Sequence, residues 1–375
     1  MAPKYAPSLR ARLPPVAFLL QLAFIVIFAF CVKVDEDEKE KGEAFFYSYA
    51  KFQDIHVMVF LGFGFLATFL VRYGFSSSAF SLLVAAMAVQ WATILHGFFL
   101  SHRLTWKIRI QLKNLVDAEL CAASSLVAMG AVHGKTNPVQ LLLFALMEVT
   151  GFVLNQWIVR TIFETGQRTN WLYSIVLLNI FGAFFGTMAS CLLFHNKVHQ
   201  KHEKEKSDRK MGLFAMFGTL FLWMFWPSLN SVLERNVSVI CSTYLSLAVS
   251  AVTATTVSLL FSAKGKINLV QSSMLAGGVA VGAVVTSSPA PWIAMTIGFC
   301  AAFLSTLGFR FLKNHMLFAF DCHDTTSVLS AHALPGIMGW FAQLILRLTR
   351  ISHSTMYDFP VNINLLIDFC DMRIY

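Results

Sequence analysis

The sequence predicts an all-α, polytopic membrane protein with about eleven transmembrane helices, and three observations support this class. Hydrophobic residues make up 57% of the 375-residue chain. Charged residues make up only 13%, whereas a soluble globular domain has about 25%. Most of the chain falls into apolar blocks of about 20 residues, the length that crosses a bilayer. These observations exclude a soluble globular enzyme.

The predicted spans follow the apolar blocks in order, because the hydrocarbon core is about 30 Å thick and a helix rises 1.5 Å per residue. They are residues 14–32, 55–71, 78–100, 115–133, 138–159, 171–194, 212–229, 237–261, 268–288, 291–312 and 327–346. The first has no small-residue cleavage site, so we expect a membrane helix there and not a signal peptide. The longest hydrophilic connections, 33–54 and 195–211, are too short to form a soluble domain.

Small residues interrupt several of these spans, and we expect them to allow close helix packing. The glycines with this predicted use are Gly62, Gly64, Gly182, Gly186, Gly277, Gly278 and Gly282.

The distribution of Lys and Arg predicts a cytoplasmic N-terminus, because cytoplasmic loops of membrane proteins collect these residues. The run of acids from Asp35 to Glu43 then lies outside, as does Asn236, which begins the glycosylation triplet Asn-Val-Ser. The collection of Lys and Arg in cytoplasmic loops also explains the net charge of +9. We therefore expect a lipid bilayer as the environment and predict no nucleic-acid partner.

Ionisable residues within predicted spans are functional candidates, because their burial in hydrocarbon costs several kcal/mol. They are His56, His96, Asp117, Glu119, Glu148 and His332. His56 and Asp117 lie near predicted helix ends, where they can reach interfacial water. For Glu148 we expect a buried hydrogen bond between helices. His332 precedes Pro335 and Gly336, which can break the helix and turn the imidazole toward a pore.

No catalytic or metal-binding pattern stands out among these residues. Asp117 and Glu119 are two positions apart and face different sides of a helix, so we do not expect a carboxylate pair. The seven cysteines show no paired spacing, and we interpret them as small apolar packing residues without a disulfide framework or zinc site. We predict that the chain is no enzyme and uses no cofactor.

Several motifs resemble the Rhesus (Rh) branch of the ammonium transporter family. They are FQDIHVMVFLGFGFL from Phe52, GAVHGK from Gly130, LFAMFGTLFLWMFWPSLN from Leu213 and LAGGVAVG from Leu275. The resemblance covers residues 1–339 and implies an ammonium-transporter-like fold. Residues 340–375 form a divergent C-terminal segment with no counterpart that we identify.

The resemblance also implies a pore, in which conducting members have two central histidines and two phenylalanine gates. The second histidine matches His332, within the stretch from Asp324 to Gly339. The first matches Asn179, in the motif LLNIFGAFFG. The gate positions match Leu120 and Leu229, and a carboxylate that recruits cations matches Trp171.

These four departures predict altered or lost transport. An amide does not titrate near neutral pH as imidazole does, and leucine offers a cation no aromatic face. Within the branch the chain looks closer to the Rh blood-group polypeptides. The resemblance therefore leaves two hypotheses: a plasma-membrane protein that moves ammonia or ammonium through an altered pore, or a non-conducting structural subunit of an Rh blood-group complex. Both imply a homo- or hetero-trimer of Rh-family subunits.

Overall fold

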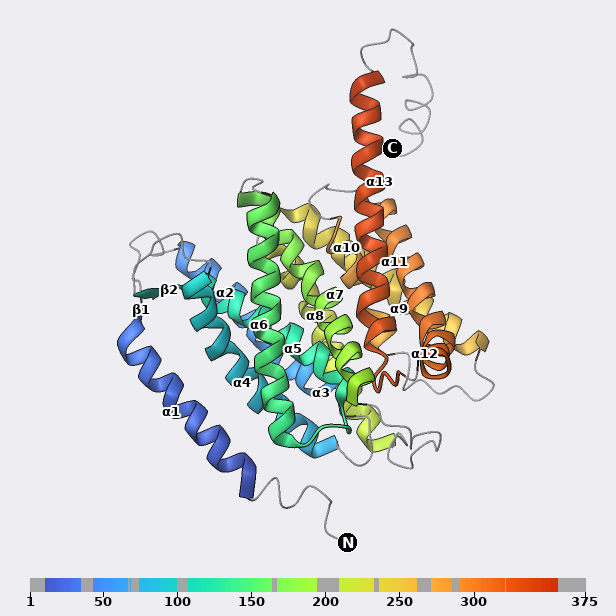
Figure 1. Cartoon of the computed structure of the whole chain (residues 1–375). Helices are drawn as coiled ribbons and strands as arrows, with labels where there is room; N and C mark the ends of the chain where they lie inside the picture. The colour runs from blue at the N-terminus through green and yellow to red at the C-terminus, as the bar shows by residue number, and fades with distance from the viewer. Residues whose placement is uncertain are drawn as a thin grey trace.

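The computed structural model is a bundle of long helices (Figure 1). It describes residues 11–34, 43–66, 68, 74–99, 107–163, 167–193, 209–232, 236–261, 271–284, 290–320 and 322–356. The longer helices are α1 (Leu13–Cys31), α2 (Glu43–Val57), α4 (Gly74–Phe99), α5 (Leu112–Val132), α6 (Pro138–Phe163), α7 (Gln167–Leu193), α8 (Arg209–Ser231), α9 (Val237–Phe261), α11 (Pro291–Leu307) and α13 (Leu334–Met356). The shorter elements are η3 (Met58–Phe63), α3 (Gly64–Leu66), η7 (Ser272–Leu275), α10 (Ala276–Val281), η9 (Gly308–Leu312), α12 (Lys313–Phe320) and η10 (Leu329–Ala333).

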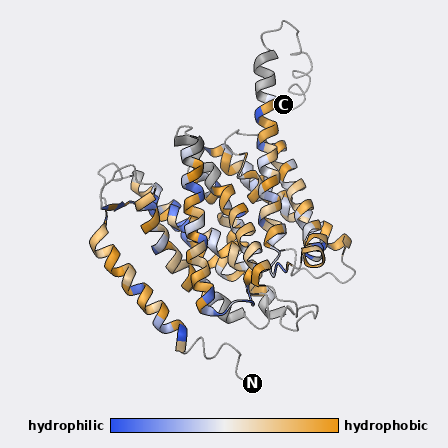
Figure 2. Cartoon of the chain, viewed as in Figure 1, coloured by the Kyte–Doolittle hydropathy of each residue, from blue (hydrophilic) through white to orange (hydrophobic). Residues whose placement is uncertain are grey.

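Nine helices within the described residues are long and apolar enough to cross a membrane, and they match nine of the predicted spans. Hydrophobic residues cover most of each long helix (Figure 2). Many of these side chains are exposed on the bundle, which is the arrangement that a lipid solvent favours. The prediction of a polytopic helical membrane protein is confirmed.

The two other predicted spans have a different form from the single helices that we expected. Over 55–71 the chain passes from α2 through the π-helical η3 into the short α3, and α2 begins at Glu43, inside the predicted loop. Within 268–288, η7 and α10 together run only from Ser272 to Val281. Apolar composition indicates that both segments lie in the membrane. It does not show where an α-helix changes to another type of helix.

The last helix crosses the predicted domain boundary without a break. α13 runs from Leu334 to Met356 and projects beyond the other helices at its C-terminal end (Figure 1). It therefore extends past the predicted end of the last span at residue 346. The division at Gly339 stays a prediction, because a continuous helix neither defines nor excludes a domain boundary.

A two-stranded sheet is the exception to the all-α architecture among the described residues. β1 (Val32–Val34) pairs in parallel with β2 (Ile108–Ile110), with Val32 opposite Ile108. The sheet follows α1 and precedes α5, so it joins the outer helix α1 to the bundle. Within the membrane-spanning part, Gln21 of α1 and Gln90 of α4 donate hydrogen bonds to each other.

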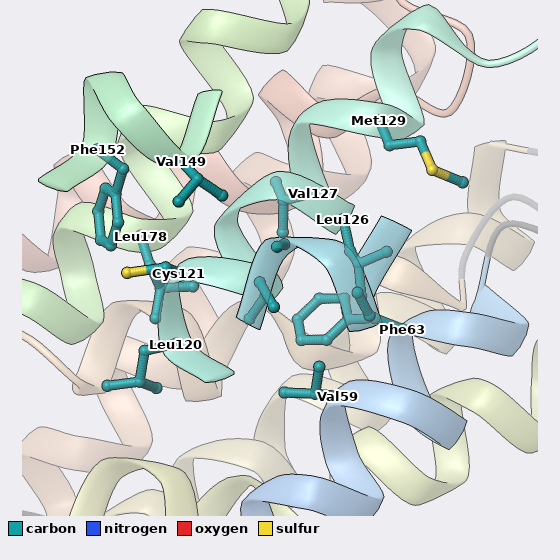
Figure 3. Close-up of a cluster of buried hydrophobic side chains, with 14 of the residues drawn as sticks. Val59, Phe63, Leu120, Cys121, Leu126, Val127, Met129, Val149, Phe152 and Leu178 are labelled. Carbon is teal, nitrogen blue, oxygen red and sulfur yellow. The ribbon is translucent and has the colours of Figure 1, made fainter. Parts of the chain in front are cut away.

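Helix α5 forms the centre of the bundle. Every residue from Val116 to Val132 is buried, and α4, α6 and α7 all pack against this helix. Figure 3 shows side chains from four elements meeting in the core cluster, among them Val59 and Phe63 of η3, Leu120, Cys121, Leu126, Val127 and Met129 of α5, Val149 and Phe152 of α6, and Leu178 of α7. The central position of α5 explains why its few ionisable residues have protein partners.

Six of the seven glycines singled out in the sequence lie at close helix contacts. A Cβ on Gly186 would lie 2.4 Å from the carbonyl oxygen of Ala128, and one on Gly277 would lie 2.5 Å from that of Ser246. Gly64 is the exception, since a Cβ there would have no neighbour within 4 Å. Small residues therefore let α7 approach α5 and α10 approach α9, as predicted.

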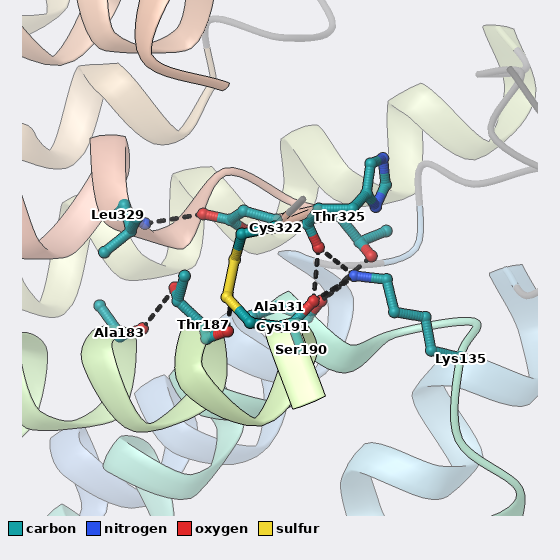
Figure 4. The surroundings of a disulfide bond; sticks show 11 residues. Ala131, Lys135, Ala183, Thr187, Ser190, Cys191, Cys322, Thr325 and Leu329 are labelled. Carbon is teal, nitrogen blue, oxygen red and sulfur yellow. Dashed lines mark hydrogen bonds between the residues drawn. A yellow bond between two sulfur atoms is a disulfide. The ribbon is translucent and has the colours of Figure 1, made fainter. Parts of the chain in front are cut away.

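A disulfide corrects our interpretation of the cysteines. Cys191, near the end of α7, bonds to Cys322, in the loop before η10, with Cα atoms 4.5 Å apart (Figure 4). The two residues are separated by 131 positions, so spacing along the chain gave no sign of the pair. Folding brings them together because the loop passes over the end of α7.

We expect removal of this bond to lower stability by about 2–4 kcal/mol, since the bond closes a long loop in the unfolded chain. The measurement is thermal unfolding in detergent of the double variant Cys191→Ser, Cys322→Ser. Cys300→Ser is the matched control, because Cys300 is a free, exposed cysteine. An equal melting temperature for both variants and the wild type would contradict the prediction.

Candidate functional site

The centre of the candidate pore is a hydrogen-bonded pair. Nδ1 of His332 in η10 lies 2.8 Å from Oδ1 of Asn179 in α7. The amide nitrogen of Asn179 also donates to the carbonyl oxygen of Ile175, one turn earlier, at 3.0 Å. Both side chains are buried, at 3% and 1% exposure. The structure therefore brings together the two residues that the family motifs assign to the pore centre.

The loop before η10 holds His332 in place. Oδ2 of Asp324 accepts the backbone N–H of Leu329 at 3.0 Å and so caps the start of η10 (Figure 4). Oγ1 of Thr325 donates to the end of α5, to the carbonyl oxygens of Ala131 and His133, each at 3.1 Å. These contacts, together with the disulfide to α7, attach the loop before η10 to α5 and to α7.

The helix around His332 continues through Pro335, where we expected a break. Residues Leu329–Ala333 form the π-helical η10, and α13 follows directly at Leu334. A π-helical turn is wider than an α-helical one and is frequent at functional sites. The helix is therefore uninterrupted at His332, and the inward-facing imidazole lies in the segment where the helix is of the π type.

A small cavity of about 30 Å³ lies beside His332. Its walls come from η3, α3, α5, η7 and η10, and they are apolar except for Ser272, Thr326 and the imidazole. The lining residues are Phe63, Leu66, Leu126, Val127, Gly130, Ser272, Thr326, Val328, Ala331 and His332. A cavity of this size has room for one or two molecules as small as water.

Phe63 is a wall residue that our sequence analysis did not single out. Its ring centroid lies 6.3 Å from that of His332. The motif around it, LGFGFL, was visible in the sequence, but both of its phenylalanines share the same pattern. Only the register of η3 distinguishes the one that faces the imidazole.

Both predicted gate residues are buried in the bundle core. Leu120 of α5 is 1% exposed and Leu229 of α8 is 2% exposed. Each follows a residue that bonds to α2. Glu119, before Leu120, lies 2.5 Å from Nδ1 of His56, and Ser228, before Leu229, donates to Oδ2 of Asp54 at 2.6 Å.

Helix α2 therefore lies between the two gate helices. Asp54 and His56 are two residues apart and point to different sides of α2. His56 had been interpreted as a side chain reaching interfacial water, and its side chain is indeed 51% exposed, but it also has a buried carboxylate partner. α2 therefore bonds to both helices that carry the predicted gate positions.

Glu148 forms the buried helix-to-helix hydrogen bond that we predicted. Oγ of Ser124 in α5 donates to Oε1 of Glu148 in α6 at 2.5 Å. The same hydroxyl lies 3.2 Å from the carbonyl oxygen of Leu178, next to Asn179. Ser124 thus links the buried acid to the helix that carries the pore centre, and no sequence signal distinguished it from its neighbour Ser125.

Two further predicted positions lie at the edges of the described residues. Trp171 falls within α7, but its side chain is outside the described part of the structure. Asn236 precedes α9, and its Oδ1 accepts the backbone N–H of Ser238 at 2.9 Å. Asn236 is exposed and caps the helix, and its use for glycosylation stays a prediction.

A lysine that the sequence analysis did not single out lies just after α5. Lys135, after α5, donates to the hydroxyl of Ser190 and to the carbonyl oxygens of His323 and Ala131 (Figure 4). A cation near the last carbonyl groups of a helix is favoured by the helix dipole. No group of three His, Cys, Asp or Glu side chains suited to a metal ion occurs among the described residues.

The comparisons with known proteins agree with this architecture. The sequence profile of the Ammonium Transporter Family matches residues 17–366, which extends beyond Gly339. Ammonium transporter Rh type A of Canis lupus familiaris is 38% identical over 363 residues, which cover 92% of this chain and 86% of that protein. Ammonium transporter Rh type C of the same species is 39% identical over 352 residues, which cover 88% of this chain and 75% of that protein.

Solved structures of this fold also superpose on the chain. Rh50 of Nitrosomonas europaea, of the Rhesus protein family of channels, superposes with a TM-score of 0.68 at 30% identity, over 80% of this chain and 82% of that chain. Mep2 of Saccharomyces cerevisiae shares the fold, with a TM-score of 0.64 at 15% identity, over 79% of this chain and 74% of that chain. The family is one of transporters and channels and not of enzymes. The chain belongs to the Ammonium Transporter Family, in its Rh branch.

Proposed function

We propose that this chain is an Rh-type subunit of the plasma membrane whose own conduction of ammonia is weak or absent. The observation that carries the proposal is the hydrogen bond between His332 and Asn179. A pair of imidazoles can pass a proton between ring nitrogens, whereas the amide of Asn179 neither gains nor loses a proton near neutral pH. The centre therefore has one titratable ring in place of two.

The gate positions support the same proposal. Leu120 and Leu229 fill their sites with aliphatic side chains that are almost fully buried. An aromatic ring at such a site can attract a cation by about 0.5–2 kcal/mol, and leucine supplies none of this energy. Trp171, where the resemblance implies a carboxylate, also lacks the charge that would draw ammonium toward the mouth.

Reconstitution tests the proposal directly. Liposomes containing the purified protein alone are mixed rapidly with an ammonium solution in a stopped-flow instrument, and the internal pH is followed. We expect a rate close to that of empty liposomes, with Nitrosomonas europaea Rh50 as the conducting control. A rate equal to that of Rh50 that falls to background in His332→Ala would overturn the proposal.

The second candidate is a non-conducting structural subunit of an Rh blood-group complex. The same substitutions at Asn179, Leu120 and Leu229 favour it, because a subunit with a structural role needs no complete pore. We infer that the chain assembles as a homotrimer or as a heterotrimer with other Rh-family subunits. Native mass spectrometry in mild detergent should show trimers, and a stable monomer would contradict this inference.

A further inference from the structure

The disulfide between Cys191 and Cys322 lies at the end of the bundle that we predict to face the cytoplasm. α7 ends at Leu193, and the connection 195–211 that follows it contains six lysines and arginines. Loops rich in these residues face the cytoplasm, where small thiols keep most cysteines reduced. A disulfide exposed to this compartment is usually transient or redox-sensing and not a permanent link.

The two sulfur atoms differ in how easily another thiol can reach them. Cys191 is half-buried, whereas Cys322 is fully buried at 0% exposure. Thiol–disulfide exchange requires an incoming thiolate to reach one of the two sulfur atoms. The attack therefore falls on Sγ of Cys191, and the sulfur of Cys322 is the leaving group.

The surroundings of the bond suit this leaving group. Nζ of Lys135 donates to the hydroxyl of Ser190 and to the carbonyl oxygen of His323, which are chain neighbours of the two cysteines (Figure 4). A positive charge nearby favours the thiolate form of a cysteine. Sγ of Cys322 also lies 3.6 Å from the carbonyl oxygen of Thr187, which can accept a hydrogen bond from the thiol after it takes up a proton.

The disulfide attaches a loop that forms part of the cavity wall. Thr326 and Val328 belong to the loop from Cys322 to Val328, and both line the cavity beside His332. After cleavage of the disulfide, hydrogen bonds such as that from Ser190 to the carbonyl oxygen of residue 323, at 2.5 Å, still connect the loop to α7. The two thiols therefore stay close enough for the disulfide to form again, while the loop has lost its covalent attachment.

We propose that the Cys191–Cys322 disulfide is a reversible exchange site for a small cytoplasmic monothiol such as glutathione, and that its reduction loosens the loop from Cys322 to Val328. The proposal goes beyond the proposed function, because it holds whether or not the pore conducts. Reduction gives the cavity beside His332 a more mobile wall on the predicted cytoplasmic side.

The exchange takes two steps. The thiolate of the first monothiol attacks Sγ of Cys191, a new S–S bond forms, and the old bond breaks with its electron pair on the sulfur of Cys322, which takes up a proton. A second monothiol then attacks the sulfur of the first, which releases Cys191 as a thiol and leaves the two monothiols joined by a disulfide. The cysteine pair gains two electrons and two protons in total, and the two monothiols lose them.

Thiol counting on the purified full chain in detergent tests the exchange. The free cysteines are blocked with N-ethylmaleimide, reduced glutathione is added without denaturant, and new thiols are counted with a maleimide mass tag after unfolding. We expect the bond to open at the ratio of reduced to oxidised glutathione found in the cytoplasm, and to close again in excess oxidised glutathione. A bond that opens only after unfolding would be a permanent structural link and would overturn the proposal.

The position of the mixed disulfide tests the direction of attack. Cys322→Ser treated with oxidised glutathione should carry glutathione on Cys191, whereas Cys191→Ser should carry little on Cys322. Cys300→Ser is the matched control and should exchange like the wild type, because Cys300 is a free cysteine. Acid quenching of the wild type during reduction gives the same information without a variant, and glutathione found mainly on Cys322 would contradict the assignment.

A reductant that does not cross membranes tests the side on which the bond lies. Cells that contain the full chain are first oxidised with diamide, which enters the cell. A membrane-impermeant phosphine should leave the bond closed in intact cells and open it after permeabilisation. Opening in intact cells would place the bond on the outer face and overturn its role as a cytoplasmic exchange site.

Hydrogen exchange followed by mass spectrometry tests the effect on the loop. Reduction should speed the exchange of the backbone amides from Cys322 to Val328 by a factor on the order of ten or more, because the covalent attachment is lost. α9 is the internal control and should exchange at the same rate in both states. Equal rates in the loop before and after reduction would overturn the proposed loosening.

Discussion

The triple variant Asn179→His, Leu120→Phe, Leu229→Phe should conduct ammonia faster than the wild type and faster than Asn179→His alone. The new histidine lies where the amide now meets Nδ1 of His332 at 2.8 Å, so two imidazoles would share one hydrogen bond. The phenylalanines add aromatic faces at both gates. If the two rings together add about 1.4 kcal/mol of cation attraction, we expect the conduction rate to be about tenfold higher than that of Asn179→His alone.

The measurement is the stopped-flow liposome assay, with the amount of folded protein set by size-exclusion chromatography. Both gate leucines are almost fully buried, so phenylalanine at these sites can also cost about 1–3 kcal/mol through overpacking. Leu143→Phe and Leu220→Phe, at exposed leucines of α6 and α8, control for the added aromatic residues alone. A folded triple variant at background flux would show that the block lies outside the centre and the gates.

The variant Gly339→Ala should lose stability by about 3 kcal/mol or more, the upper range for an overpacked core. A Cβ at this position would lie 2.1 Å from the carbonyl oxygen of Ala280 and 2.8 Å from its carbon. Both are backbone atoms, so no side-chain rotation relieves the clash. Helices α10 and α13 would have to separate, and the turn that carries His332 directly precedes α13.

Gly64→Ala is the matched control, because a Cβ there meets no atom within 4 Å. Alanine in a helix is favoured over glycine by about 0.5–1 kcal/mol, so this variant should be neutral or slightly stabilised. Thermal unfolding in detergent, followed by tryptophan fluorescence, compares the two with the wild type. Similar melting temperatures for both variants would contradict the close packing of α10 against α13.

The fold class could be predicted from the sequence because a bilayer imposes a simple requirement. Each spanning helix must satisfy its backbone within itself and present apolar side chains, and hydropathy detects this directly in helices such as α1 and α9. The change to π-helix at Met58 escaped prediction, since it depends on how η3 packs against α8. The resemblance to the family supplied the pore positions, which composition could not.

The contacts of the candidate site were predicted less completely. The sequence placed Glu148 in a helix-to-helix hydrogen bond, but its partner Ser124 belongs to another helix and carries no distinguishing pattern. The pairing of Cys191 with Cys322 was missed for the same reason. Contacts between distant segments depend on the three-dimensional path of the chain. A single sequence does not show which distant residues this path brings together.

The hydrogen bond between Asn179 and His332 has a consequence for biosynthesis. The partners are 153 positions apart, so at about 5–20 residues per second the ribosome needs roughly 8–30 s to make the second after the first. α7 ends at Leu193, so it is complete for most of this interval, and the hydrogen bond of Asn179 to the carbonyl oxygen of Ile175 needs no residue outside this helix. The contact between α7 and η10 at the candidate pore centre therefore forms only after the last helices have been made.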